Sequence, residues 1–309
     1  MNITALRSDY IYQQVIQAPP EDKLELFRQE MLAPFMKQWQ IQQIPFRAEE
    51  ANGFDAISFN SGMMNRAPDQ MTPNILPEVE WISADSFWSG CEQAVTTSLR
   101  QFIEHGISLP VSDYLFTVQL GNPENRALTI NEGYSGFGGI PGFIWITLLP
   151  NEHNISRMKA ALAHECSHNV RYQYIQWDHT VDLGELIVSE GLAENYATSL
   201  FGEELLGPWV TRTDTEPLNR RIKPVLREQL QLTGFHQFAP YLYGDELAEL
   251  QNFQPVNMPY SAGYACGYHL IKYYLRKTGK TIWEATIMPA AQILEEAKGF
   301  WDEETIISG

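Results

Sequence analysis

Residues 163–169 read Ala-His-Glu-Cys-Ser-His-Asn, and the apolar pattern around them predicts a helix over residues 155–172. His164 and His168 are four residues apart, so both imidazoles lie on one face of that helix and can bind a single ion. Glu165 lies one step further round, where its carboxylate can reach a water on the ion without binding the ion itself. This spacing is typical of zinc hydrolases. The alternative is a surface helix with two unrelated histidines.

Composition limits the partners of this chain. Its 309 residues carry a net charge of −17 at pH 7 with no run of Lys and Arg, which argues against nucleic acid. The N-terminus lacks an apolar segment of signal-peptide length, and the most apolar run, residues 142–150, is too short to span a bilayer. The three cysteines, Cys91, Cys166 and Cys266, are too widely spaced to suggest a disulfide framework. We therefore expect a cytoplasmic protein without a membrane partner, of undetermined oligomeric state.

The first half of the chain combines helical and strand-like patterns. Residues 20–40 form an amphipathic pattern, residues 84–106 predict a second helix, and residues 113–120 predict a strand. The apolar stripe of the first helix is aromatic, and it favours packing in the core over a ligand groove. Its members are Phe27, Met31, Phe35 and Trp39.

A glycine-rich stretch, residues 133–142, precedes the motif helix and suggests a loop. A phosphate-binding loop would be followed by a helix, but residues 143–149 are strand-like. We expect this strand to be the edge strand that pairs with an extended substrate backbone, with an ordinary sheet strand as the alternative. Asn154 is the expected cap of the motif helix.

A further helix is predicted over residues 182–201, and its inward stripe carries Glu190 and Glu194 among apolar side chains. Two carboxylates on an apolar stripe cost free energy unless a positive charge compensates them. A zinc ion beside the stripe would supply that charge.

A catalytic zinc ion has three protein ligands in most enzymes, so His164 and His168 need a partner. One protease pattern places a third histidine six residues after His168, but Tyr174 stands there. Another pattern takes a glutamate from a second helix, and Glu190 follows His168 by 22 residues (190 − 168). His179, in the polar connection between the two helices, is the rival third ligand.

Three segments resemble the gluzincin branch of zinc peptidases. They are the His-Glu-x-x-His pattern at 164–168, Ser-Glu-Gly-Leu-Ala-Glu at 189–194 and Ala-Gly-Tyr-Ala-Cys-Gly-Tyr at 262–268. More narrowly, the segments are similar to those of the bacterial YjaZ-like predicted zinc-dependent proteases. The resemblance covers residues 115–277, whereas residues 1–110 resemble no family.

The resemblance implies a role for each matching residue. His164, His168 and Glu190 would bind Zn²⁺, and Glu165 would be the general base. Glu194 stands where gluzincins often have an aspartate beside a ligand histidine. We expect Glu194 to accept the spare ring N–H of His164 and so to fix its tautomer.

A tyrosine hydroxyl is the expected stabiliser of the oxyanion that forms during hydrolysis. The aromatic helix predicted over residues 259–277 has Tyr260, Tyr264 and Tyr268 on one face. The resemblance favours Tyr264, and Tyr260 is the second choice. The alternative for each tyrosine is packing in an aromatic core.

The sequence therefore predicts an α+β, gluzincin-like fold. It would have N-terminal helices, a mixed sheet with an edge strand by the active site, and a mainly helical C-terminal lobe. Residues 1–110 would be an N-terminal α+β region without an assigned role, and residues 111–309 the catalytic region. The expected function is zinc-dependent cleavage of a peptide or protein substrate. A non-catalytic zinc-binding scaffold or regulatory protein is the main alternative, and an amidase or esterase acting on other substrates is a third.

Overall fold

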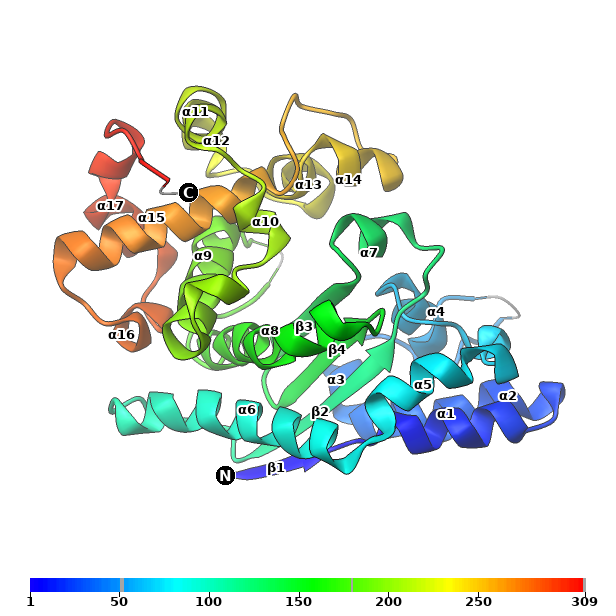
Figure 1. The fold of residues 1–309 in the computed structure, drawn as a ribbon. Helices are drawn as coiled ribbons and strands as arrows, with labels where there is room; N and C mark the ends of the chain where they lie inside the picture. Colours follow the sequence, from blue (N-terminus) through cyan, green and yellow to red (C-terminus); the bar gives the residue numbers. More distant parts are fainter. Residues whose placement is uncertain (51–52, 179, 308–309) are drawn as a thin grey trace. The chain divides into compact units, whose positions relative to one another are not determined.

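The computed structural model describes residues 1–50, 53–178 and 180–307 (Figure 1). Its contacts divide the chain into two compact units. Unit 1 contains Met1–Thr97 and Pro110–Glu165, and unit 2 contains Ser98–Leu109 and Cys166–Gly309. The chain combines a four-stranded sheet, in unit 1, with many helices, so the expected α+β class is confirmed. The expected division into residues 1–110 and residues 111–309 stays a prediction.

The sheet of unit 1 has the strand order β1-β2-β4-β3 (Figure 1). Neighbours β1 and β2 are parallel, as are β2 and β4, whereas β3 is antiparallel to β4. In this register Phe116 is opposite Ile144, and Phe137 is opposite Trp145. The strands are β1 (Asn2–Ala5), β2 (Asp113–Leu120), β3 (Tyr134–Ile140) and β4 (Phe143–Leu148).

Strand β4 lies inside the sheet, so the expectation that residues 143–149 form the edge strand is wrong. Every residue of β4 is buried, which is typical of a strand with partners on both sides and covered faces. The edge beside β4 is occupied by β3, within the glycine-rich stretch 133–142 that suggested a loop, and β1 forms the other edge. Glycine weakens a strand, but here the backbone of β3 pairs with β4, with an irregularity in the register between Phe137 and Ile140.

Helices before and between the strands complete unit 1. The aromatic stripe of residues 20–40 is fully buried, and the ring of Phe35 stacks on Trp145 of β4 at 5.5 Å between centroids. Trp39 meets the same indole edge-on at 5.4 Å, so the stripe packs in the core, as expected. The helices are α1 (Ser8–Gln17), α2 (Pro20–Phe27), α3 (Met36–Ile41), α4 (Ala56–Gly62), α5 (Leu76–Ser83), α6 (Asp85–Glu104, which continues into unit 2) and α7 (Arg126–Ile130). Short turns of other helix types are at Arg28–Leu32, Ala33–Phe35, Pro68–Gln70 and Pro73–Ile75.

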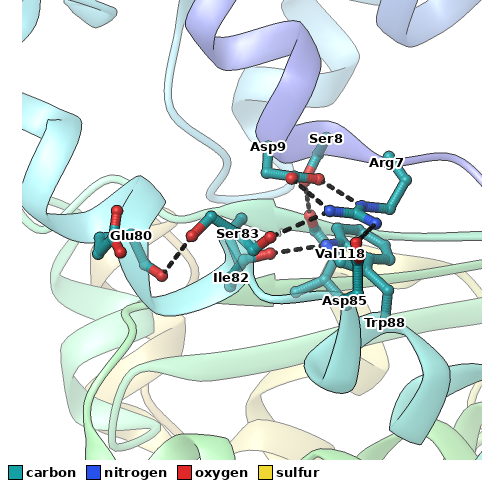
Figure 2. A network of polar contacts seen from close by, with 9 residues as sticks. All are labelled: Arg7, Ser8, Asp9, Glu80, Ile82, Ser83, Asp85, Trp88 and Val118. Atoms are coloured by element: carbon teal, nitrogen blue, oxygen red, sulfur yellow. Dashed lines mark hydrogen bonds and ion pairs between the residues drawn. The ribbon is translucent and has the colours of Figure 1, made fainter.

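A polar network fixes the N-terminal segment in unit 1 (Figure 2). The guanidinium of Arg7 donates two hydrogen bonds of 2.8 Å to the carboxylate of Asp9 and one of 2.7 Å to Asp85. The side chain of Asp9 is fully buried, and the charge of Arg7 compensates it. The hydroxyl of Ser8 donates to the carbonyl oxygen of Val118 in β2. These contacts join β1 and α1 to α6 and to the sheet.

The helices of unit 2 pack around α9 (Leu183–Phe201) and α15 (Ala262–Thr278), which lie side by side (Figure 1). A β-carbon at Gly267 would lie well under 3.0 Å from the carbonyl oxygen of Ile187, so glycine allows the two backbones to approach closely. The other helices are α10 (Pro208–Thr211), α11 (Thr215–Pro217), α12 (Lys223–Gln229), α13 (Phe235–Tyr243), α14 (Asp245–Leu250), α16 (Ile282–Thr286) and α17 (Ala290–Glu296). Short turns are at Glu203–Leu205, Leu218–Ile222 and Lys298–Trp301.

The cysteines Cys91, Cys166 and Cys266 are buried, and these three residues are not in disulfide bonds. Burial raises the pKa of Cys91 and of Cys266 to about 12, so both thiols remain protonated at neutral pH. Within the residues that the structure describes, no helix is long and apolar enough to cross a membrane.

Candidate metal centre

The motif lies on helix α8 (Glu152–Arg171), close to the predicted range of 155–172. The helix begins earlier than expected because Asn151, not Asn154, provides the cap: its side-chain oxygen accepts a hydrogen bond of 2.9 Å from the backbone N–H of Asn154. The side chain of Asn154 instead donates to the carbonyl oxygens of Glu132 (2.9 Å) and Leu149 (2.8 Å). It thereby attaches the first turn of α8 to the chain segments around β3 and β4.

His164, His168 and Glu190 come together in the structure. One potential ligand atom from each lies within 4.8 Å of the others, and among the described residues this is the one group of its kind. Both histidines are buried, and Glu190 is partly exposed. Glu190 projects from α9, which begins where the carboxylate of Asp182 accepts a hydrogen bond from the backbone N–H of Glu185.

One distance within this group matches a zinc site. Nε2 of His168 lies 3.4 Å from Oε2 of Glu190. Zinc binds nitrogen and oxygen at about 2.0–2.1 Å, so neighbouring ligand atoms of a tetrahedral site are about 3.3–3.4 Å apart. Two imidazoles and one carboxylate form a ligand set found in catalytic zinc sites, where the fourth position is left for water.

Glu165 lies against the edge strand β3 within unit 1. Its side chain is buried, and a β-carbon at Gly136 would lie well under 3.0 Å from its carboxylate. A β-carbon at Gly138 would lie similarly close to the backbone carbonyl of Glu165. The glycines of β3 therefore allow a strand backbone to pass directly beside the expected general base.

A hydrogen-bonded pair beside His168 did not emerge from the sequence patterns. Nδ1 of His168 lies 3.1 Å from Oγ of Ser189, and this Oγ lies 2.8 Å from the hydroxyl of Tyr172. Ser189 directly precedes Glu190, and Tyr172 follows His168 by one helical turn. These positions in the sequence, next to Glu190 and one turn after His168, could have indicated the pair. The contact between the two hydroxyls, however, depends on the packing of α8 on α9.

Glu194 is buried on α9, one turn after Glu190. Its carboxylate accepts a hydrogen bond of 2.7 Å from the backbone N–H of Gly207 and one of 3.0 Å from the indole N–H of Trp209. These donors stabilise a charged side chain inside unit 2. The expected hydrogen bond from His164 to Glu194 stays a prediction.

The three candidate tyrosines have different surroundings. The ring of Tyr264 lies 5.9 Å from that of Tyr243, a residue of α13 that the sequence patterns did not indicate. Tyr260 lies under the guanidinium of Arg212, 4.8 Å from the ring centroid. Tyr268 is almost fully buried, with its hydroxyl donating to Glu203 over 3.3 Å. The predicted helix begins at Ala262 rather than residue 259, so Tyr260 lies just before it.

Tyr243 is linked to the candidate metal centre electrostatically, and Tyr264 is its hydrogen-bond partner. Burial raises the pKa of the Tyr243 hydroxyl, and the negative charge of Glu190 raises it further, whereas a hydrogen bond with the Tyr264 side chain opposes both effects. The Tyr243 hydroxyl therefore remains protonated at neutral pH, and it lies close enough to Glu190 to sense its charge. His179, the rival third ligand, lies outside the described residues.

Comparison with known proteins gives the class of this protein. The family described as Predicted Zn-dependent protease (DUF2268) matches residues 87–295, more than half of the chain. The chain belongs to this family.

A relative covers nearly the whole chain. It is the protein YjfC of Bacillus subtilis (strain 168), whose description reads "Uncharacterized protein YjfC". The two sequences are 34% identical over 306 residues, which is 96% of this chain and 98% of the relative. No solved structure matches the chain.

Proposed function

We propose that this protein is a gluzincin-type zinc metallopeptidase that cleaves peptide bonds in a peptide or protein substrate. The observation that carries the proposal is the group of His164, His168 and Glu190, whose His168–Glu190 distance suits tetrahedral zinc, in a chain of the predicted zinc-dependent protease family. Glu165, on the same helix as the two histidines, supplies the carboxylate that hydrolysis requires.

His164, His168 and Glu190 would hold the zinc ion. When bound in such a site, zinc lowers the pKa of water towards neutrality and polarises a substrate carbonyl. Glu165 accepts the proton of the attacking water and then delivers it to the leaving amine. Tyr264 donates a hydrogen bond to the oxygen of the carbonyl under attack, and Tyr243 holds the Tyr264 hydroxyl in position. Tyr260 remains the second choice for the donor.

The position of β3 supports an extended peptide as the substrate. β3 is the last strand in the sheet, and its glycines pass directly beside Glu165. An extended segment added alongside such a strand would have its backbone aligned past the general base. We therefore propose that β3, rather than residues 143–149, pairs with the extended substrate backbone.

Metal content measured on the purified protein and three variants tests the proposal. We expect about one zinc ion per chain in the wild type, none after Glu190→Gln, and full content after His179→Ala and Glu165→Gln. Turnover of a peptide library should be lost with Glu165→Gln although zinc remains. Unchanged turnover in that variant would favour a different reaction or a non-catalytic zinc-binding protein. Zinc retained by Glu190→Gln and lost by His179→Ala would overturn the ligand assignment.

A further inference from the structure

We infer that Ser189 and Tyr172 form a hydrogen-bonded pair that positions His168 for metal binding, an inference that rests on the proposed zinc site. The contacts run from Nδ1 of His168 to Oγ of Ser189 (3.1 Å) and on to the hydroxyl of Tyr172 (2.8 Å). They engage the ring nitrogen opposite the one that lies 3.4 Å from Glu190.

The tautomer of His168 follows from this arrangement. Nε2 is the ring nitrogen nearest to Glu190, so binding one ion together with Glu190 requires its lone pair. A neutral imidazole then carries its proton on Nδ1, and this N–H donates to the oxygen of Ser189. The opposite tautomer would place a proton on Nε2 and prevent it from binding a metal ion. When Nε2 binds the ion, Ser189 accepts the Nδ1–H and so stabilises the tautomer that acts as a ligand.

The acceptor is held rigidly. Ser189 is buried and directly precedes Glu190 on α9, so one turn of this helix carries both a metal ligand and the acceptor for another ligand. The ring of Tyr172 is nearly parallel to that of His168, at an interplanar angle of 7° and a centroid distance of 6.0 Å. Trp177 packs against Tyr172 edge-on at 4.9 Å, which restrains the ring that bears the second hydroxyl.

The end of α8 is fastened independently to the same helix. The buried guanidinium of Arg171 donates a hydrogen bond of 2.7 Å to the carboxylate of Glu185 in α9. It also donates to the carbonyl oxygens of Thr286 (2.8 Å) and Met288 (2.9 Å). These bonds fix the backbone of the helical turn that contains His168. The hydroxyls of Ser189 and Tyr172 therefore act on the orientation of the His168 ring.

Zinc affinity, measured by competition with a chelator, tests the inference. Ser189→Ala should lower the affinity about ten-fold or more, and Ser189→Thr, which keeps the hydroxyl, should stay within about three-fold of the wild type. Tyr172→Phe should cause a smaller loss than Ser189→Ala, because Ser189 can still accept from His168. The matched control is Ser167→Ala. Ser167 lies on α8 and is buried like Ser189, but among the described residues its hydroxyl has no hydrogen-bond partner. The Ser167→Ala variant should bind zinc with the affinity of the wild type.

A spectroscopic measurement separates positioning from general packing. In the cobalt(II)-substituted protein, the ring N–H protons of ligand histidines give strongly shifted NMR signals that disappear when they exchange with D₂O. The Nδ1–H of His168 should exchange slowly in the wild type and the Ser167→Ala control. It should exchange markedly faster in Ser189→Ala, because the acceptor is gone. Ser189→Thr should restore the slow exchange.

The outcomes distinguish this inference from the proposed function. Equal zinc affinities and N–H exchange rates in Ser189→Ala and Ser167→Ala would overturn the positioning role and leave the zinc site intact. Equal losses in the alanine and threonine variants would assign the effect to packing and also overturn it. A wild-type protein that takes up no zinc would overturn both proposals.

Discussion

Gly136 of the edge strand faces the carboxylate of Glu165 so closely that no side chain fits between them. A β-carbon built at Gly136 would lie well under 3.0 Å from Oε1, Cδ and Cγ of Glu165. Gly139, on the same strand, differs: its β-carbon would be 3.5 Å from the ring of Phe137, an ordinary contact. The strand thus has one glycine, Gly136, that leaves room for the carboxylate of Glu165, the proposed general base, and another, Gly139, that does not contact it.

Gly136→Ala should abolish most turnover while leaving zinc binding intact. The added methyl group would displace the carboxylate of Glu165, and a misplaced general base should lower kcat/KM by about 100-fold or more. Zinc content should not change because Glu165 is not a proposed ligand. The control Gly139→Ala should retain near wild-type kcat/KM, and equal activities for the two variants would contradict the role of the close approach.

Glu194→Gln should destabilise the metal-free protein. An amide offers one oxygen to the two N–H donors of Gly207 and Trp209, so one of them would face an NH₂ group. Leaving a buried donor unsatisfied costs about 1–3 kcal/mol of unfolding free energy, which chemical denaturation would measure. A fall in zinc affinity in the same variant would support the predicted hydrogen bond from His164. Unchanged affinity would speak against that bond.

Gly267→Ala should loosen the packing of α15 on α9. The new methyl group would meet the carbonyl oxygen of Ile187, and overpacking of this kind costs about 1–3 kcal/mol. Gly90→Ala is the opposite case: Gly90 lies on α6, is exposed, and has nothing within 4 Å of a built β-carbon. That variant should gain about 0.5–1 kcal/mol from helix propensity. Denaturation midpoints that shift in the same direction for both variants would refute this account.

His269 should make the stability of the protein depend on pH. Burial lowers the pKa of His269 to about 4 from the ordinary value of 6.5, aided by the nearby charges of Lys272 and Lys223 and opposed by Glu203. As the pH falls, His269 is therefore protonated at a higher pH in the unfolded chain than in the folded protein. The contribution of the neutral imidazole to the free energy of unfolding is fully present above pH 6.5 and is lost as the pH falls towards 4.

His269→Gln removes this titration. Between pH 6.5 and 4 the wild type should lose up to about 3 kcal/mol more unfolding free energy than the variant, and above pH 6.5 their difference should be constant. Denaturation at a series of pH values measures both curves. Parallel curves over the whole range would show that His269 does not titrate on unfolding.

The local elements around the motif could be predicted well from the sequence. The helices expected over residues 155–172 and 182–201 correspond to α8 and α9, and the strand over residues 113–120 corresponds to β2. Apolar periodicity and capping residues are local signals, and these segments are long enough to show them clearly. The spacing of His164 and His168 is likewise a property of one helix, so the sequence alone determined that they share a face.

The order of the strands could not be predicted in this way. Strand-like residues at 143–149 looked the same whether the strand was at the edge or inside the sheet, and glycines at 133–142 looked like a loop. Strand pairing depends on contacts between distant segments, which no local pattern records. Only the fold showed that β3 is an edge strand and that Gly136 and Gly138 are required by the proximity of Glu165.

The sequence by itself thus determined the helix that carries His164, Glu165 and His168, and the inward phase of Glu190, because each depends on spacing within one helix. The tertiary structure decided which residues surround them. It brought Glu190 within reach of His168, put the oxygen of Ser189 beside the other ring nitrogen, and gave Glu194 its donors from the segment after α9. These contacts join residues whose positions relative to one another are fixed only when the helices pack.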